Sequence, residues 1–119
     1  MSKEFVPYEQ AVALKELGFN EPCFGWFTEE HLKIGPVDGK NVQGENEILA
    51  PTYSQAFRFF REKYDLNYEI SYAGKHKQYH AFVDGFHYGN NGYVASVFPY
   101  EEAEKVCLNM MIKKVVKNR

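Results

Sequence analysis

The alternation of apolar and polar positions predicts three helices, and each of them begins with a similar short motif. Near residues 7, 51 and 99, a proline is followed by a tyrosine and then by Gln-Ala or Glu-Ala. Proline suits the first turn of a helix, because its missing N–H group would have no partner there. Apolar residues then recur at helical spacing. The pattern predicts helices over residues 7–17, 52–65 and 99–116.

Two of these helices carry specific end signals. Gly18 offers the left-handed conformation that stops a helix, and Phe19 is placed to pack back on Leu14, as in a Schellman motif. Thr52 and Gln55 have the spacing of a capping box, in which each side chain bonds to the backbone N–H of the other residue. We therefore expect the second helix to begin at Thr52.

Between the helices, the periodicity changes to that of strands. The predicted strands are residues 23–28, 31–34, 68–72, 78–83, 86–88 and 93–98. The predicted turns are Glu29-Glu30, residues 74–77, Asp84-Gly85 and residues 90–92. Asp-Gly between two strands is a strong hairpin signal. Strands joined by such tight turns pair antiparallel.

The order of these elements predicts an α+β fold. We expect an antiparallel sheet of four to six strands with three helices on one face, in the order α-β-β-α-β-β-β(-β)-α. The 119 residues suffice for one domain, which we expect to span residues 1–119. Residues 35–47 are rich in Gly, Asn and Asp and lack periodicity, which predicts a flexible surface loop.

Composition limits the class of protein. Ten Phe, nine Tyr and one Trp would build either an aromatic core or an exposed aromatic face, and the sequence leaves both open. The net charge of −2 lacks the positive excess typical of nucleic-acid binding. Cys23 and Cys107 are too few and too far apart for a disulfide scaffold. The sequence contains neither a signal-peptide pattern nor an apolar run of membrane-spanning length, so we expect a cytoplasmic protein with no membrane partner.

Residues that could carry catalysis or bind a metal are scattered along the chain. The four histidines are His31, His76, His80 and His87. They lack the close-spaced pairs of metal sites. Cys107 lies on an apolar row of the last helix, where a buried thiol is expected. We expect no metal, no cofactor and no catalytic residue, and His80, Asp84 and His87 form the one trio that an enzyme would use.

A nucleic-acid interface is the alternative that the sequence supports next. The rings of Tyr68, Tyr72, Tyr79 and Phe82 would offer stacking surfaces for bases, beside the cations of residues 75–77. Residues 68–112 resemble small sheet-reading DNA-binding domains of the integrase-arm and plant AP2 type. Those domains carry arginines on the reading strands, whereas this chain has Glu69, Ser71 and Asp84.

A second resemblance covers more of the chain. The resemblance lies in residues 8–27, 50–66 and 100–115. The segments APTYSQAFRFFREKYDL (residues 50–66) and YEEAEKVCLNMMIKKV (residues 100–115) look like recurring elements of small proteins from Bacteroides-type gut bacteria and their prophages. In that family, an aromatic helix is followed by aromatic strands and a Tyr-Glu-Glu-Ala helix. The resemblance implies a cytoplasmic protein of phage or mobile-element origin. It implies no activity, cofactor or catalytic residue.

These observations together favour a non-catalytic binding or accessory protein, which would act through contacts with another protein or with itself. A sheet-based nucleic-acid binder is the alternative, and a small enzyme comes third. Exposed aromatic rings and nearby cations are the side chains most typical of binding surfaces. The candidate binding residues are Trp26, Arg58, Arg61, Tyr72, Lys75, Lys77 and Tyr79.

Overall fold

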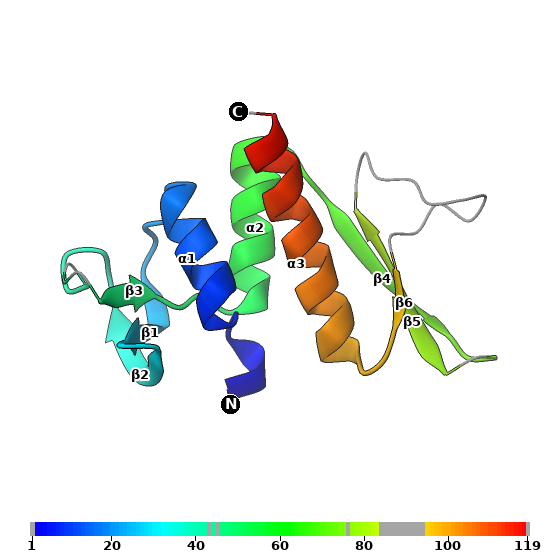
Figure 1. Cartoon of the computed structure of the whole chain (residues 1–119), viewed down its shortest axis with the longest axis horizontal. Coiled ribbons are helices and arrows are strands. Elements are labelled where there is room, and N and C mark those ends of the chain that lie inside the picture. The colour runs from blue at the N-terminus through cyan, green and yellow to red at the C-terminus, as the bar shows by residue number, and fades with distance from the viewer. Residues whose placement is uncertain (1, 43, 45, 76, 84–94, 119) are drawn as a thin grey trace. The chain divides into compact units, whose positions relative to one another are not determined.

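The computed structural model of the chain describes residues 2–42, 44, 46–75, 77–83 and 95–118, and it has the expected α+β class (Figure 1). The elements are, in order, η1 (Ser2–Glu4), α1 (Tyr8–Glu16), β1 (Cys23–Thr28), β2 (His31–Val37), β3 (Glu47–Leu49), α2 (Tyr53–Tyr64), β4 (Tyr68–Ala73), β5 (Gln78–Val83), β6 (Ala95–Val97) and α3 (Tyr100–Lys117). Three helices and antiparallel strands confirm the predicted order, to which the structure adds the short strand β3.

Within the described residues, the strands form two sheets of three strands each, in the orders β2-β1-β3 and β4-β5-β6, where we expected one larger sheet. The chain correspondingly divides into two compact units, Met1–Ala56 (unit 1) and Phe57–Arg119 (unit 2), and the division falls within α2. The expected loop at residues 35–47 is shorter than predicted, because β2 extends to Val37 and β3 begins at Glu47.

In unit 1, the middle strand β1 alternates between buried and more exposed positions. Cys23, Gly25 and Phe27 are buried, and the Phe27 ring meets Tyr8 of α1 edge-on at 5.5 Å. The turn between β1 and β2 is Glu29-Glu30, as predicted, and both residues have positive φ angles of 50° and 70°. Two positive φ values define the tight hairpin turn that Asn and Gly adopt most readily.

The predicted helix ends are also present in unit 1. The Phe19 N–H donates to the Leu14 carbonyl at 2.9 Å, and Gly18 has a φ of 97°, as a Schellman motif requires. At the start of α2, the Gln55 N–H donates to Thr52 Oγ1 and the Thr52 N–H donates to Gln55 Oε1, both at 3.2 Å. Thr52 and Gln55 therefore form the predicted capping box.

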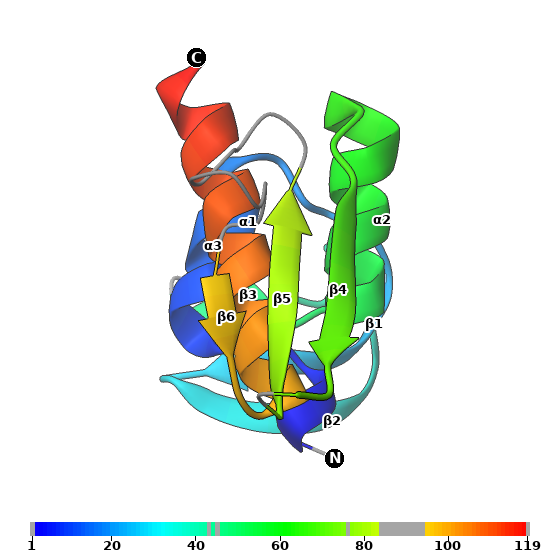
Figure 2. The same ribbon diagram turned by 90° about the vertical axis from the view of Figure 1, so that its right-hand side faces the viewer.

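In unit 2, α3 packs against one face of the sheet β4-β5-β6, with β5 in the middle (Figure 2). The strand register places Tyr68, Ile70 and Tyr72 of β4 opposite Val83, Ala81 and Tyr79 of β5. Because strand neighbours alternate between faces, all six share the face that α3 covers. The α3 residues buried in this layer are Ala103, Cys107, Leu108, Met111 and Val115.

The predicted hairpin at Asp84-Gly85, the strand at 86–88 and the turn at 90–92 lie outside the described residues. The last predicted strand, residues 93–98, is represented by β6 over Ala95–Val97. β6 pairs antiparallel with β5, and Val97 lies opposite Tyr79. The end of β6 therefore lies beside the β4–β5 turn.

Candidate functional site

Two of the predicted binding residues, Tyr72 and Tyr79, lie side by side where the β4–β5 hairpin turns. They are direct partners in the strand register, and their ring centroids are 5.1 Å apart. Tyr100, the first residue of α3, meets Tyr79 edge-on at 5.2 Å. Phe98 joins β6 to α3 at the same end of the sheet. We call Tyr72, Tyr79, Phe98 and Tyr100 the aromatic end.

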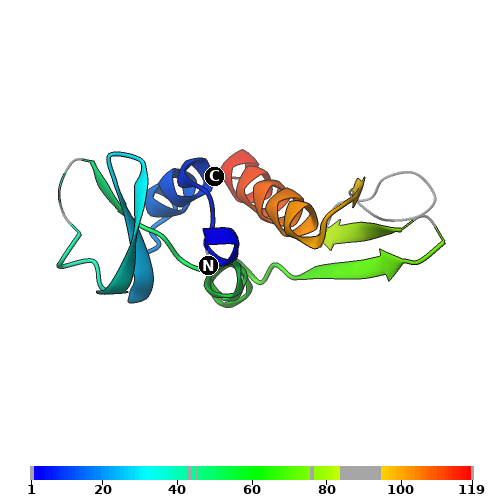
Figure 3. The ribbon, with the colours of Figure 1, turned by 90° about the horizontal axis from the view of Figure 1, so that it is seen from below.

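Three of the four rings in the aromatic end are exposed to solvent. The exposed fractions are 59% for Tyr72, 66% for Phe98 and 40% for Tyr100. Figure 3 shows the reason, since the β4–β5 hairpin extends past the first turn of α3 and the helix does not cover its tip. Farther along the same face, where α3 does cover the sheet, Ala81 and Val83 are buried. Tyr72 and Tyr100 are thus more exposed than Ala81 and Val83, which lie under α3 in the middle strand.

The cations predicted for the site divide into two groups within unit 2. Lys75 and Lys77 are exposed in the turn that joins Tyr72 to Tyr79. Arg58 and Arg61 are exposed on α2, and Arg61 lies near Tyr68, at the other end of β4 from the turn. The structure therefore brings Lys75 and Lys77, and not the arginines, to the aromatic end.

Trp26 belongs to unit 1, where it lies on β1 and packs across Gly35. A Cβ atom at Gly35 would be 3.5 Å from the Trp26 ring. The indole is half-buried, whereas its neighbour Phe24 is 64% exposed. Of the seven predicted residues, Tyr72, Lys75, Lys77 and Tyr79 form one group, and Trp26 is a separate surface residue of unit 1.

The four rings proposed for base stacking do not share one face of the sheet. Phe82 lies opposite Glu69 on the outer face, whereas Tyr68 and Tyr79 lie on the face toward α3. Tyr68 also stacks on Phe57 of α2 at 3.8 Å. The outer face presents Glu69 and Ser71 in β4. Alternation along the two strands could have shown this separation from the sequence.

Sequence reasoning missed Phe98 and Tyr100 as members of this surface. Tyr100 was interpreted only as part of a helix start, and Phe98 only as the end of a strand. The signal that could have found them is the chain path, because a strand that pairs with β5 and then enters α3 must place its last residues beside the β4–β5 turn.

Ionisable groups gather behind the aromatic end, between α3 and the sheet. Burial raises the pKa of Glu104, and the nearby Glu101 carboxylate raises it further. Burial also raises the pKa of Tyr68 and of Tyr100, and both feel the negative charge of Glu104. This environment therefore favours the neutral forms of one carboxyl and two phenols.

Both thiols are buried and weakly acidic. Burial raises the pKa of Cys23 and that of Cys107 to about 12. Each thiol has a backbone carbonyl acceptor, Glu21 O for Cys23 at 3.3 Å and Phe82 O for Cys107 at 3.8 Å. A reactive cysteine needs a lowered pKa and access to solvent, so both are typical of structural thiols.

The two histidines that the structure describes belong to different units. His31 is exposed at the β1–β2 turn of unit 1, and His80 lies opposite Ser71 in unit 2. His76 and His87, together with Asp84 of the predicted trio, are outside the described residues. Within the described ranges, no group of three or more His, Cys, Asp or Glu side chains is placed to hold a metal ion.

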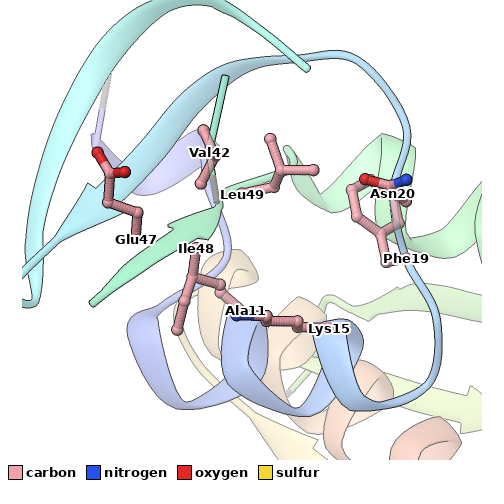
Figure 4. A pocket seen from close by; sticks show the side chains of 8 residues that line it. All are labelled: Ala11, Lys15, Phe19, Asn20, Val42, Glu47, Ile48 and Leu49. Atoms are coloured by element: carbon pink, nitrogen blue, oxygen red, sulfur yellow. The ribbon is translucent and has the colours of Figure 1, made fainter. Parts of the chain in front are cut away.

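A small cavity of about 50 Å³ lies in unit 1, between α1 and β3 (Figure 4). It is lined by Ala11, Lys15, Phe19, Asn20, Val42, Glu47, Ile48 and Leu49. A second hollow, of about 200 Å³, lies in unit 2 beside Tyr64, Leu66 and the last turns of α3. Pockets for organic ligands usually measure about 300–1,000 Å³, so both are small for that purpose.

Comparison with known proteins gives one partial similarity. A stretch of 59 residues is 42% identical to UDP-N-acetylmuramate–L-alanine ligase from Streptococcus gordonii, and it covers 46% of this chain. The match spans 12% of the ligase. No protein-family model and no solved structure matches the chain. In the part of the chain that the structure describes, no helix is both long enough and apolar enough to cross a membrane.

Proposed function

We propose that this chain is a non-catalytic binding or accessory protein that acts through protein–protein contacts made by its aromatic end. The observation that carries this proposal is the exposure of Tyr72 and Tyr100, whose rings both contact Tyr79, together with the exposed Phe98 in the segment that joins β6 to α3. Exposed aromatic groups of this kind mark interaction sites on soluble proteins. Tyrosine suits such a surface, because its ring supplies contact area and its hydroxyl supplies a hydrogen bond.

The chemistry of the rest of unit 2 agrees with a binding role. The ring surface is positioned by a hairpin and a helix start, both of which are held by buried residues such as Ala81 and Ala103. A rigid support of this kind lowers the entropy lost when a surface binds its partner. The resemblance of residues 50–66 and 100–115 to small phage-associated proteins of gut bacteria supports a cytoplasmic accessory protein of phage or mobile-element origin.

Nucleic-acid binding is the second candidate, and the position of Lys75 and Lys77 beside the exposed Tyr72 favours it. Single-stranded nucleic acid binds to surfaces that combine cations with stacking rings. Such binding would weaken steeply as salt is added. Fluorescence anisotropy with labelled single strands at low and high salt would distinguish it from protein binding.

Site-specific photo-crosslinking tests the proposed protein contact. A p-benzoyl-phenylalanine residue in place of Tyr72, in the native host, should yield light-dependent adducts with a protein, identified by mass spectrometry. The matched control carries the same residue in place of Glu69, which is exposed on the opposite face of β4. Adducts that form equally at both positions, or at neither, would contradict a binding role for the aromatic end.

A further inference from the structure

The charges around the aromatic end are separated by sign. Lys75 and Lys77 lie in the turn that follows Tyr72 and precedes Tyr79, and Glu101 and Glu102 directly follow Tyr100 in the first turn of α3. The rings of Tyr79 and Tyr100 are in contact at 5.2 Å, and they connect the start of β5, which follows the lysine-bearing turn, to the start of α3, which carries the glutamates. A ring surface is thus bordered by two cations on the hairpin and two anions on the helix.

An arrangement of this kind is self-complementary. In a two-fold symmetric pair, a residue of one copy faces a different residue of the other copy, and the same contact occurs twice. The lysines of each copy would face the glutamates of the other, with the exposed rings between them. A partner surface of a single charge would instead leave one of the two charged groups facing its own sign, which is unfavourable.

We infer that the aromatic end is the interface of a homodimer in which two copies of this chain pair through their rings, Lys75 and Lys77 of each facing Glu101 and Glu102 of the other. The inference rests on the proposed function and names the partner. Charged pairs at the rim of an interface contribute little affinity and mainly select the partner and its orientation. The dimer is therefore weak, reversible and sensitive to salt.

Sedimentation equilibrium of the full chain tests the inference. Between about 10 µM and 1 mM, a range that covers weak interfaces, the average mass should rise from that of the monomer toward twice that value. Added salt should shift the rise to higher concentration. Tyr72→Ala should weaken the association at least about tenfold, as expected for loss of a central ring.

Charge exchange makes the test specific. The variants Lys75→Glu/Lys77→Glu and Glu101→Lys/Glu102→Lys should each dimerise at least about tenfold more weakly than the wild type, because like charges then face each other. An equal mixture of the two variants should associate more tightly than either alone. Lys113→Glu/Lys117→Glu, near the other end of α3, is the matched control and should dimerise like the wild type.

A further double variant protects the test against misfolding. Lysines in the first turn of a helix oppose the helix dipole, so Glu101→Gln/Glu102→Gln is measured as well, with circular dichroism as the check on folding. It should also weaken the dimer, by less than the lysine variant.

The inference is wrong if the wild type keeps the monomer mass over the whole range, or if mixing the charge variants restores no association. Photo-crosslinks from position 72 to a different protein, together with a monomeric chain, would overturn the dimer and leave the proposed function standing. An absence of both kinds of contact would overturn both.

Discussion

Removal of the Thr52 hydroxyl should destabilise the protein by about 1 kcal/mol, the usual effect of losing a helix N-cap side chain. Thr52 Oγ1 accepts a hydrogen bond from the Gln55 N–H at 3.2 Å. In Thr52→Ala, this N–H group loses its acceptor at the start of α2. Thr52→Ser keeps a hydroxyl in the same position, so it should stay within about 0.5 kcal/mol of the wild type.

Substitutions of Gln55 separate the contribution of the capping box to stability from that of a longer-range hydrogen bond. Its Oε1 atom caps the Thr52 N–H, and its Nε2 atom donates to the Pro22 carbonyl at 2.9 Å, 33 residues away in sequence. Gln55→Ala removes both bonds, which gives an expected loss of about 1–2 kcal/mol at about 1 kcal/mol for each neutral bond. Gln55→Glu keeps the acceptor and loses the donor, so its stability should fall between those of the wild type and Gln55→Ala.

Urea unfolding measures these differences. The transition is followed by the fluorescence of Trp26 and by far-ultraviolet circular dichroism, and the free energy is extrapolated to water at a common m-value. The reasoning fails if Thr52→Ala unfolds at the same urea concentration as the wild type. It fails equally if Thr52→Ser loses as much stability as Thr52→Ala, because the hydroxyl would then have no part in the effect.

Three further predictions concern single features of the two units. Glu29→Asn/Glu30→Gly should raise stability by about 1 kcal/mol in thermal unfolding, because both positions have positive φ angles; an unchanged melting temperature would contradict this. Cys23 and Cys107, whose pKa values burial raises to about 12, should react with iodoacetamide at pH 8 about a thousandfold more slowly in the folded protein than in urea. Mass spectrometry of the alkylated protein reports each thiol separately. The raised pKa values also mean that the contribution of the two thiols to stability is fully present below pH 9 and falls as the pH rises toward 12. Burial raises the pKa of Glu104, so its stabilising contribution is present below pH 4.5 and is lost as the pH rises through the raised value. The melting temperature of Glu104→Gln should therefore be higher than that of the wild type at pH 7 and equal to it near pH 4. The same difference in melting temperature at both pH values would refute a role for ionisation of Glu104.

The sequence predicted those parts of the fold that depend on local signals. The capping box at Thr52 and the Schellman motif at Gly18 each involve residues close in sequence, and the hydrogen bonds found there are those the motifs require. The strand β3 was missed, because its three residues are too few to show a periodicity. The division into two sheets was missed as well, since it depends on which strands pair with one another, and the local periodicity of a strand does not specify its partner.

The part of the candidate site that lies on the β4–β5 hairpin was predictable from the sequence. Tyr72 and Tyr79 flank one turn, so their proximity follows from the hairpin. The grouping of Arg58 and Arg61 with them did not follow from any local rule, and the structure places these arginines on α2, with Arg61 near Tyr68 at the other end of β4. Trp26 belongs to unit 1. The contribution of Tyr100 depends on how α3 packs on the sheet, which no single segment of sequence encodes.

The alternation of side chains along β4 helps to set the register in which it pairs with β5. Tyr68, Ile70 and Tyr72 face the helix, and Glu69 lies between them on the outer face. A slip of one residue would turn the Glu69 carboxylate toward the layer between α3 and the sheet and would move the half-buried Ile70 to the outer face, so misaligned pairings are disfavoured. β4 is also an edge of its sheet, where a charged side chain discourages the addition of further strands. Glu69 therefore helps to keep an aromatic-rich hairpin from assembling into open-ended sheets.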